Sequence, residues 1–109
     1  MSDGSVNKAI LLGRAVDAKP ELRHTPSGGT VTSFRLVTFS KYKDEGGKRR
    51  IAKQWHKLEA WDDLAKLCSK KVKPGVKIYA EGRILYSMHE EDGVRWQWTK
   101  IKISEIQFL

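Results

Sequence analysis

The sequence predicts one all-β domain that contains a single short helix. Several segments are rich in Val, Ile, Thr and aromatic residues, and glycine-containing turn sequences separate them. Only one stretch places apolar residues at helical spacing. The chain has 109 residues, enough for one modest core, so we expect a single domain over residues 1–109.

The first predicted strand runs from about Ser5 to Ala15 and is apolar on both faces at positions 9–13. That pattern is typical of a central strand or of a strand under a subunit contact. A short extended piece over Glu21–Thr25 follows. Pro26-Ser27-Gly28-Gly29 then predicts a chain reversal before Thr30.

The second long strand is predicted from Thr30 to Tyr42. Phe34 and Leu36 share one parity, whereas Val37 and Phe39 share the other, so no single face is cleanly apolar. We therefore expect a bulge or strong coiling near the middle of this strand.

A polar, basic connection is expected over Lys43–Arg50, because it contains Gly46-Gly47 between charged residues. Such runs are commonly solvated loops. This one leads directly into a strand that carries tryptophans, which favours a binding role.

The third strand covers Lys53–Trp61. Successive strand residues point to opposite faces, so Trp55, Lys57 and Trp61 share a surface while Leu58 and Ala60 can enter a core. Exposed indoles beside lysines suit nucleobases beside phosphates. The alternative is that both tryptophans are buried in the fold or at an interface.

A helix over Asp62–Lys70 is predicted next, with Asp62 or Asp63 as its N-cap. Leu64, Leu67 and Cys68 form its apolar stripe, so the cysteine is expected in the core.

Two further strands complete the chain, Val76–Met88 and Val94–Leu109, joined through the acidic turn at 90–93. Trp96 and Trp98 share a parity with Lys100 and Lys102 on the last strand. The apolar parity shifts after Ser104, which predicts a bulge there.

Five coiled strands with one helix between the third and fourth follow the plan of the OB-fold, a five-stranded Greek-key barrel that binds oligonucleotides. The net charge of +8 and the isoelectric point near 9.7 favour a polyanionic partner.

Composition argues for a cytoplasmic, nucleoid-associated protein without a metal or cofactor. Cys68 is the only cysteine and cannot form an internal disulfide, and the three histidines have no ligand spacing. No targeting segment or apolar run of membrane-spanning length is present in the sequence. An organellar origin is the alternative.

Four segments carry a family resemblance: Asn7-Lys8-Ala9-Ile10-Leu11-Leu12-Gly13-Arg14, Pro26-Ser27-Gly28-Gly29, Gln54-Trp55-His56-Lys57 and Val76-Lys77-Ile78-Tyr79-Ala80-Glu81-Gly82. In order and spacing they resemble the bacterial and mitochondrial single-stranded DNA-binding proteins. The resemblance implies an OB-fold subunit of a homotetramer that binds and protects single-stranded DNA in replication, recombination and repair, without marked sequence preference.

The resemblance also implies roles for individual residues. Trp55, Trp61 and Tyr42 fall at base-stacking positions, and Trp96 and Trp98 are candidates to replace a family tryptophan that is missing near Met88. Subunit contacts are implied for three residues: His56, Tyr79 and Asn7. Charge and position suggest a set of phosphate contacts: Lys57, Arg83, Arg49, Arg50, Lys43 and Lys73.

Two features leave alternatives open. Bacterial relatives end in an acidic, phenylalanine-tipped tail that recruits proteins, whereas this sequence ends at Ile106-Gln107-Phe108-Leu109, so recruitment through a tail is doubtful. The rival functions are a primosomal or RNA-binding accessory module, an oligomeric scaffold and a metal-dependent nuclease. We expect no enzyme, because the acidic residues are explained by caps and turns.

Overall fold

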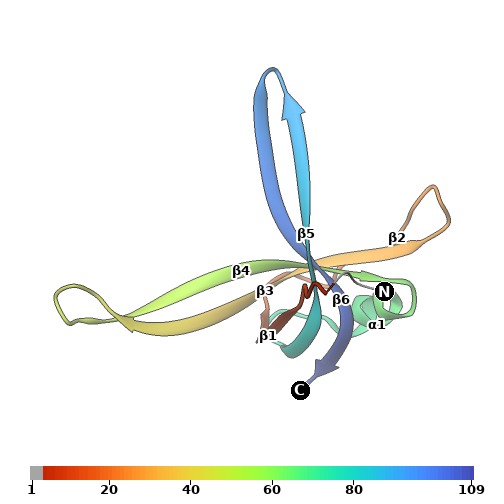
Figure 1. Ribbon diagram of the computed structural model, residues 1–109. Helices are drawn as coiled ribbons and strands as arrows, with labels where there is room; N and C mark the ends of the chain where they lie inside the picture. Colours follow the sequence, from red (N-terminus) through yellow and green to blue (C-terminus); the bar gives the residue numbers. More distant parts are fainter. Residues whose placement is uncertain (1–3) are drawn as a thin grey trace.

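The computed structural model describes residues 4–109 and consists of a small barrel from which two long hairpin arms project (Figure 1). The elements are β1 (Ala9–Ala15), β2 (Arg23–His24), β3 (Thr30–Lys43), β4 (Arg49–Trp61), α1 (Asp62–Lys71), β5 (Lys77–Glu91) and β6 (Val94–Phe108). The radius of gyration is 16.2 Å. A compact chain of this length would have about 13 Å, so the arms account for an extended shape.

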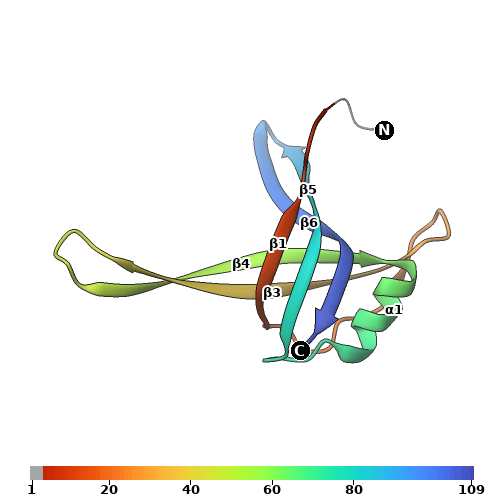
Figure 2. The same cartoon turned by 60° about the horizontal axis from the view of Figure 1, so that its bottom comes forward.

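The barrel contains five strands in the order β1-β5-β6-β4-β3, and β2 adds two residues at the edge of β3. It closes through antiparallel β1–β3 pairs at Arg14 and Ala15, and through a short parallel β4–β6 contact. Gly13 permits the first closure, because a Cβ there would collide with the carbonyl oxygen of Val37. Figure 2 shows β1, β5 and β6 crossing over β3 and β4. The predicted OB-fold is confirmed.

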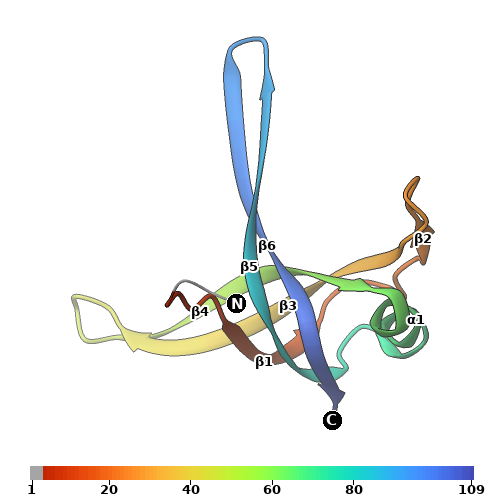
Figure 3. The ribbon, with the colours of Figure 1, turned by 45° about the vertical axis from the view of Figure 1, so that its right-hand side comes forward.

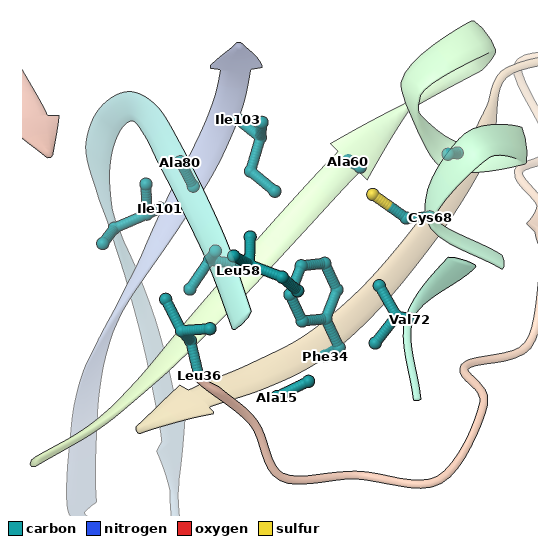
Figure 4. Packing of buried hydrophobic residues seen from close by; sticks show 12 residues of the cluster. Ala15, Phe34, Leu36, Leu58, Ala60, Cys68, Val72, Ala80, Ile101 and Ile103 are labelled. Atoms are coloured by element: carbon teal, nitrogen blue, oxygen red, sulfur yellow. The ribbon is translucent and has the colours of Figure 1, made fainter. Parts of the chain in front are cut away.

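The core fills the barrel and continues under α1 (Figure 4). Phe34 and Leu36 of β3 meet Leu58 of β4 and Ile78 of β5, and all four are at most 2% exposed. The helix adds Ala65 and Cys68, so the expected core position of the cysteine is confirmed. Burial raises the pKa of the Cys68 thiol to about 11.

The arms are the outer halves of β3–β4 and of β5–β6 (Figure 3). Both faces of each ribbon are largely exposed there. The β5–β6 arm turns at Asp92-Gly93, where both residues have positive φ as the tightest hairpins require. The β3–β4 arm turns at 44–48, where the Asp44 carboxylate accepts hydrogen bonds from the Gly46 and Lys48 amides.

Several sequence-based expectations were wrong in detail. The β1 strand begins at Ala9, not near Ser5. Of the bulge or strong coiling expected in β3, the bulge is wrong, because the β3–β4 register runs unbroken from Val31–Trp61 to Lys43–Arg49, whereas the β3–β4 ribbon is visibly twisted (Figure 2). The mixed parity of β3 arises because both faces are partly covered within the barrel. The predicted 43–50 connection is shorter, since Lys43, Arg49 and Arg50 lie within strands.

The helix start also differs from the prediction. Trp61 occupies the N-cap position without a side-chain cap, and Asp62 adopts a positive φ of 54°. Asp62 and Asp63 instead lie in the first turn, where negative charge is favourable near the helix N-terminus. By contrast, the predicted bulge at Ser104 is confirmed, because Glu81 pairs with Glu105 whereas Gly82 pairs with Ile103.

No helix within residues 4–109 combines the length and the apolar character that crossing a bilayer requires.

Candidate nucleic-acid interface

A cleft lies where the β3–β4 arm and the β5–β6 arm diverge from the barrel. It has a volume of about 480 Å³ and is lined from β3, β4, β6 and the loop after β1. We call it the inter-arm cleft. Its lining residues are Asp17, Ser33, Phe34, Arg35, Trp55, His56, Lys57, Trp98, Thr99, Lys100 and Ile101.

The cleft brings together residues that lie more than 40 positions apart in the sequence. Trp55 and Lys57 come from β4, and Trp98 comes from β6. Trp55 is 56% exposed and Trp98 is 43% exposed, so both indoles can be contacted from solvent. His56 also lines the cleft and shares a hydrogen bond of 2.8 Å with the Thr38 hydroxyl. Burial lowers the pKa of His56, which favours its neutral form.

The Trp55 surface continues along the β3–β4 arm. In this antiparallel register odd-numbered residues pair with odd-numbered residues, so Trp55, Phe39 and Arg49 share one face. Phe39 is 55% exposed, and the Lys53 ammonium lies 5.9 Å from its ring centroid. Phe39 was not singled out from the sequence. Its parity with Trp55 becomes visible only when the hairpin register is known.

Tyr42 and Arg50 lie on the other face of the same arm, opposite one another in register. Tyr42 is exposed and helps to line a shallow hollow at the arm tip. Arg50 donates to Asp44 at 2.9 Å, which lowers the pKa of that carboxyl. The structure therefore separates Tyr42 and Arg50 from the face that carries Trp55.

Trp61 and Glu59 lie at the parallel contact between β4 and β6, which we call the seam. Trp61 is only partly exposed: its indole ring abuts Gly29, and the Lys102 ammonium lies 5.6 Å from its centroid. The Trp61 Nε1–H donates to Glu59 at 2.7 Å, and Lys100 Nζ donates to the other Glu59 oxygen at 2.8 Å.

Glu59 shares the parity of Trp55, Lys57 and Trp61 on β4, yet it is only 7% exposed. Burial opposes its ionisation, but the hydrogen bonds from Lys100 and Trp61 outweigh burial, so the pKa of Glu59 lies below its ordinary value. Glu59 is therefore a carboxylate in the structure.

A second ion pair borders the cleft. Arg35 donates from Nε and Nη2 to Asp17, at 3.0 and 2.8 Å, and its backbone amide donates to the same carboxylate at 2.7 Å. The hydrogen bond from the Arg35 side chain is the main cause of the lowered pKa of Asp17. The sequence analysis missed both residues, although Arg35 lies directly opposite Lys57 in the β3–β4 register.

Trp96 lies farther out on the β5–β6 arm. Its ring stacks on His89, with centroids 5.5 Å apart and planes inclined by 23°. His89 lies 3.4 Å from a Glu91 oxygen. Because one face of Trp96 is occupied by His89, the other face is the one that a ligand can use.

The remaining predicted phosphate contacts lie apart from one another. Arg83 is exposed at the base of the β5–β6 arm, beside Lys102 in register. Lys73 lies in the loop between α1 and β5, at the end of β5 away from the arm. The structure does not bring Lys73 to the cleft.

The three residues predicted at subunit contacts have clear positions within the subunit. Asn7 extends the β1–β5 ladder: its side chain donates to the Ile84 carbonyl at 2.8 Å and accepts from the Ile84 amide at 2.9 Å. Tyr79 donates to Glu81 on the outer face of the barrel, opposite the exposed Leu12. His56 lies at the inter-arm cleft.

Among residues 4–109, no three His, Cys, Asp or Glu side chains are grouped closely enough to hold a metal ion.

Comparison with known proteins gives a consistent result. The model of the single-strand binding protein family matches residues 6–109. Single-stranded DNA-binding protein 1 of Chlorobaculum tepidum is 34% identical over 106 residues, which are 95% of this chain and 65% of the relative. The single-stranded DNA-binding protein of Neisseria meningitidis serogroup A is 32% identical, covering 96% of this chain and 60% of the relative. The chain thus spans about two thirds or less of the length of these curated relatives.

Two solved structures share the fold. One is described as the Plasmodium falciparum SSB complex with ssDNA; it superposes with a TM-score of 0.89 at 24% identity and covers 100% of this chain and 99% of that one. The other is a deletion mutant of the single-stranded DNA binding protein from Thermus aquaticus. Its TM-score is 0.81 at 26% identity, over 95% of this chain and 50% of that one.

Proposed function

This chain belongs to the single-strand binding protein family, and from that premise we propose that it binds single-stranded DNA without marked sequence preference. The observation that carries the proposal is the inter-arm cleft, which is lined by two exposed tryptophans from different arms together with Lys57. The protein would protect DNA strands exposed in replication, recombination and repair, in the cytoplasm, as a binding protein and not as an enzyme.

The chemistry of the cleft supports sequence-independent binding. Each base has a flat face that can stack on Trp55 or Trp98, and stacking contributes roughly 1–3 kcal/mol per base whatever its identity. The Trp55 face then leads past Phe39 to Lys43 and Arg49 at the arm tip. Alternating aromatic and cationic side chains of this kind suit a strand whose bases and phosphates alternate.

We further propose that the subunit forms a homotetramer. Ile10 and Leu12 are more than half exposed on the outer face of the barrel, beside Tyr79. Within residues 4–109, positions 9–13 of β1 pair with β5 alone, which leaves the other edge of that segment available for a second chain. Light scattering with and without oligo-dT measures this directly, and a monomer in both states would contradict it.

The DNA-binding proposal is tested by titrating the protein with oligo-dT and following tryptophan fluorescence. Stacking of bases on Trp55 and Trp98 should quench the emission at saturation. Equal-length single-stranded RNA and duplex DNA serve as competitors. Stronger competition by RNA would instead favour an RNA-binding accessory module, and an unchanged spectrum at saturating oligo-dT would favour a scaffold.

A further inference from the structure

The seam places a buried carboxylate next to a cleft that is otherwise suited to an anionic ligand. Glu59 is 7% exposed, and it lies between Trp61 and Lys100. A carboxylate repels phosphates, so a carboxylate at this position weakens the binding of an anionic ligand unless it has another role.

The cleft contains three cationic side chains, and two of them already have anionic partners. Lys100 is paired with Glu59 at 2.8 Å, and Arg35 is paired with Asp17 at 2.8 Å. Among residues 4–109, no carboxylate lies within ion-pair distance of Lys57. Lys57 is therefore the one lining cation of the described chain without an ion-pair partner, and its charge acts on Glu59 only at longer range, where it helps to lower the pKa of that carboxyl.

We propose that Glu59 is a positioning residue that sets the charge of the inter-arm cleft by neutralising Lys100, a lining residue, while it also fixes the indole edge of Trp61 at the adjoining seam. This inference rests on the proposed function, because it concerns how the cleft receives DNA. Lys100 then acts as a structural cation at the seam and contributes little to phosphate binding, despite lining the cleft.

The two Glu59 oxygens are each used once, which makes the arrangement specific to a carboxylate. Oε1 accepts from Trp61 and Oε2 accepts from Lys100. A glutamine in the same place has one acceptor and one donor group, so it can keep only one of these hydrogen bonds. In either orientation it leaves the positive charge of Lys100 without a counter-charge.

The seam is also where the barrel ends and the arms begin. Leu58 pairs with Ile101 and Glu59 pairs with Lys102, and these are the parallel contacts between β4 and β6. The ion pair between Lys100 of β6 and Glu59 of β4 therefore ties the two arm-bearing strands together, and the hydrogen bond from Trp61 holds the same carboxylate from within β4. The aromatic ring of Trp61 is held by Glu59, Gly29 and Lys102 before any ligand arrives.

The test is the dependence of oligo-dT affinity on salt. For single strands the slope of log affinity against log salt is about −0.7 per phosphate neutralised. Glu59→Gln should steepen the slope by about 0.7, because Lys100 becomes available, and should tighten binding at low salt. The double variant Glu59→Gln with Lys100→Met should return to the slope of the unaltered protein.

Two control variants show how large a change of the salt slope is to be expected. Lys57→Met removes the available cation and should flatten the slope by about 0.7. Glu21→Gln removes a carboxylate in the loop before β2, outside the lining of the cleft, and should leave the slope unchanged.

The outcomes separate the possibilities. An unchanged slope in Glu59→Gln, with Lys57→Met flattened, would mean that Glu59 serves stability alone and would overturn the proposal. If Glu59→Gln does not fold, the double variant Glu59→Gln with Lys100→Met decides. A salt slope in the double variant that is about 0.7 flatter than in the unaltered protein would show that Lys100 contacts phosphate in the native protein, and would overturn the proposal. Absence of any salt-dependent binding by the unaltered protein would overturn the proposed function itself and this inference with it.

Discussion

The barrel and the arms are built from the same strands, yet their residues are used in opposite ways. On β4, Leu58 is fully buried between strands of the barrel, whereas Trp55, three residues earlier on the same strand, is 56% exposed at the cleft. On β6, Ile103 is buried in the barrel and Trp98 is exposed on the arm. Each strand thus passes from a core into solvent within a few residues.

The difference indicates that separate halves of each strand serve stability and the proposed DNA binding. Burial of apolar side chains stabilises the barrel, at roughly 25 cal/mol per Å² of area removed from water. In the arms neither face has such a core, so the exposed aromatic and basic residues there contribute little to stability and are free to contact a ligand or a partner. Substitutions in the two halves should therefore affect different measurements.

The largest effect is expected in the barrel. Leu58→Ala removes a fully buried side chain that packs in the cluster of Phe34 and Leu36, and should lower the free energy of unfolding by about 2–5 kcal/mol. Urea denaturation measures this loss. The salt slope of oligo-dT binding should not change at a temperature where the variant is folded. A changed slope would show that the barrel half of β4 also contributes to binding.

The next effect is expected at the cleft. Trp55→Ala should weaken oligo-dT binding by about 1–3 kcal/mol, because one stacking surface is lost, while the free energy of unfolding changes little. Fluorescence titration and urea denaturation of the same preparation test both parts. Trp55→Phe is the matched control, and it should recover part of the affinity. If Trp55→Ala lowered the free energy of unfolding by as much as it lowered the free energy of binding, the indole would belong to the core.

A smaller effect is expected at the arm tip, where neighbouring arginines provide an internal comparison. Arg49 lies on the Trp55 face, whereas Arg50 lies on the other face and is paired with Asp44. Arg49→Ala should flatten the salt slope by about 0.7, and Arg50→Ala should flatten it less. Equal changes of the salt slope in the two variants would mean that coiling of the arm brings both of its faces into contact with the bound DNA.

The smallest effect is a dependence of stability on pH at the seam. The pKa of Glu59 is lowered in the folded protein, so its ion pair stabilises the fold above the ordinary value of 4.5, and this contribution is lost as the pH falls through the folded pKa. Between pH 5 and pH 3 the unaltered protein should therefore lose more stability than the double variant Glu59→Gln with Lys100→Met. Equal losses by urea denaturation would show that Glu59 is not ionised in the fold.

Much of the barrel could be predicted from parity, because buried faces leave alternating apolar residues. Leu58 and Ala60 were expected inside, and the parity shift at Ser104 identified a real bulge. The arms could not be predicted, since strand-like alternation continues past the point where the core ends. The separation of Tyr42 from Trp55 follows from the hairpin register, which depends on where the turn at 44–48 lies.

The roles of Glu59 and Asp62 depended on tertiary contacts. Glu59 has the parity of an exposed residue, and only the passage of β6 beside β4 buries it. Asp62 has the sequence signature of a helix cap, but the turn from β4 into α1 places Trp61 there instead. Neither outcome leaves a local signal in the sequence.

The shortness of the seam has a mechanical consequence. The parallel ladder between β4 and β6 contains two residue pairs, and the tip of the β3–β4 arm lies ten residues away along β4, a lever of about 33 Å at 3.3 Å per residue. If the arm rotates as a rigid body, a turn of about 6° at the seam moves the tip by about 3.4 Å, the spacing of stacked bases along one strand. Under the proposed function, a small rotation at the seam would thus shift the reach of the arm along a bound strand by about one base.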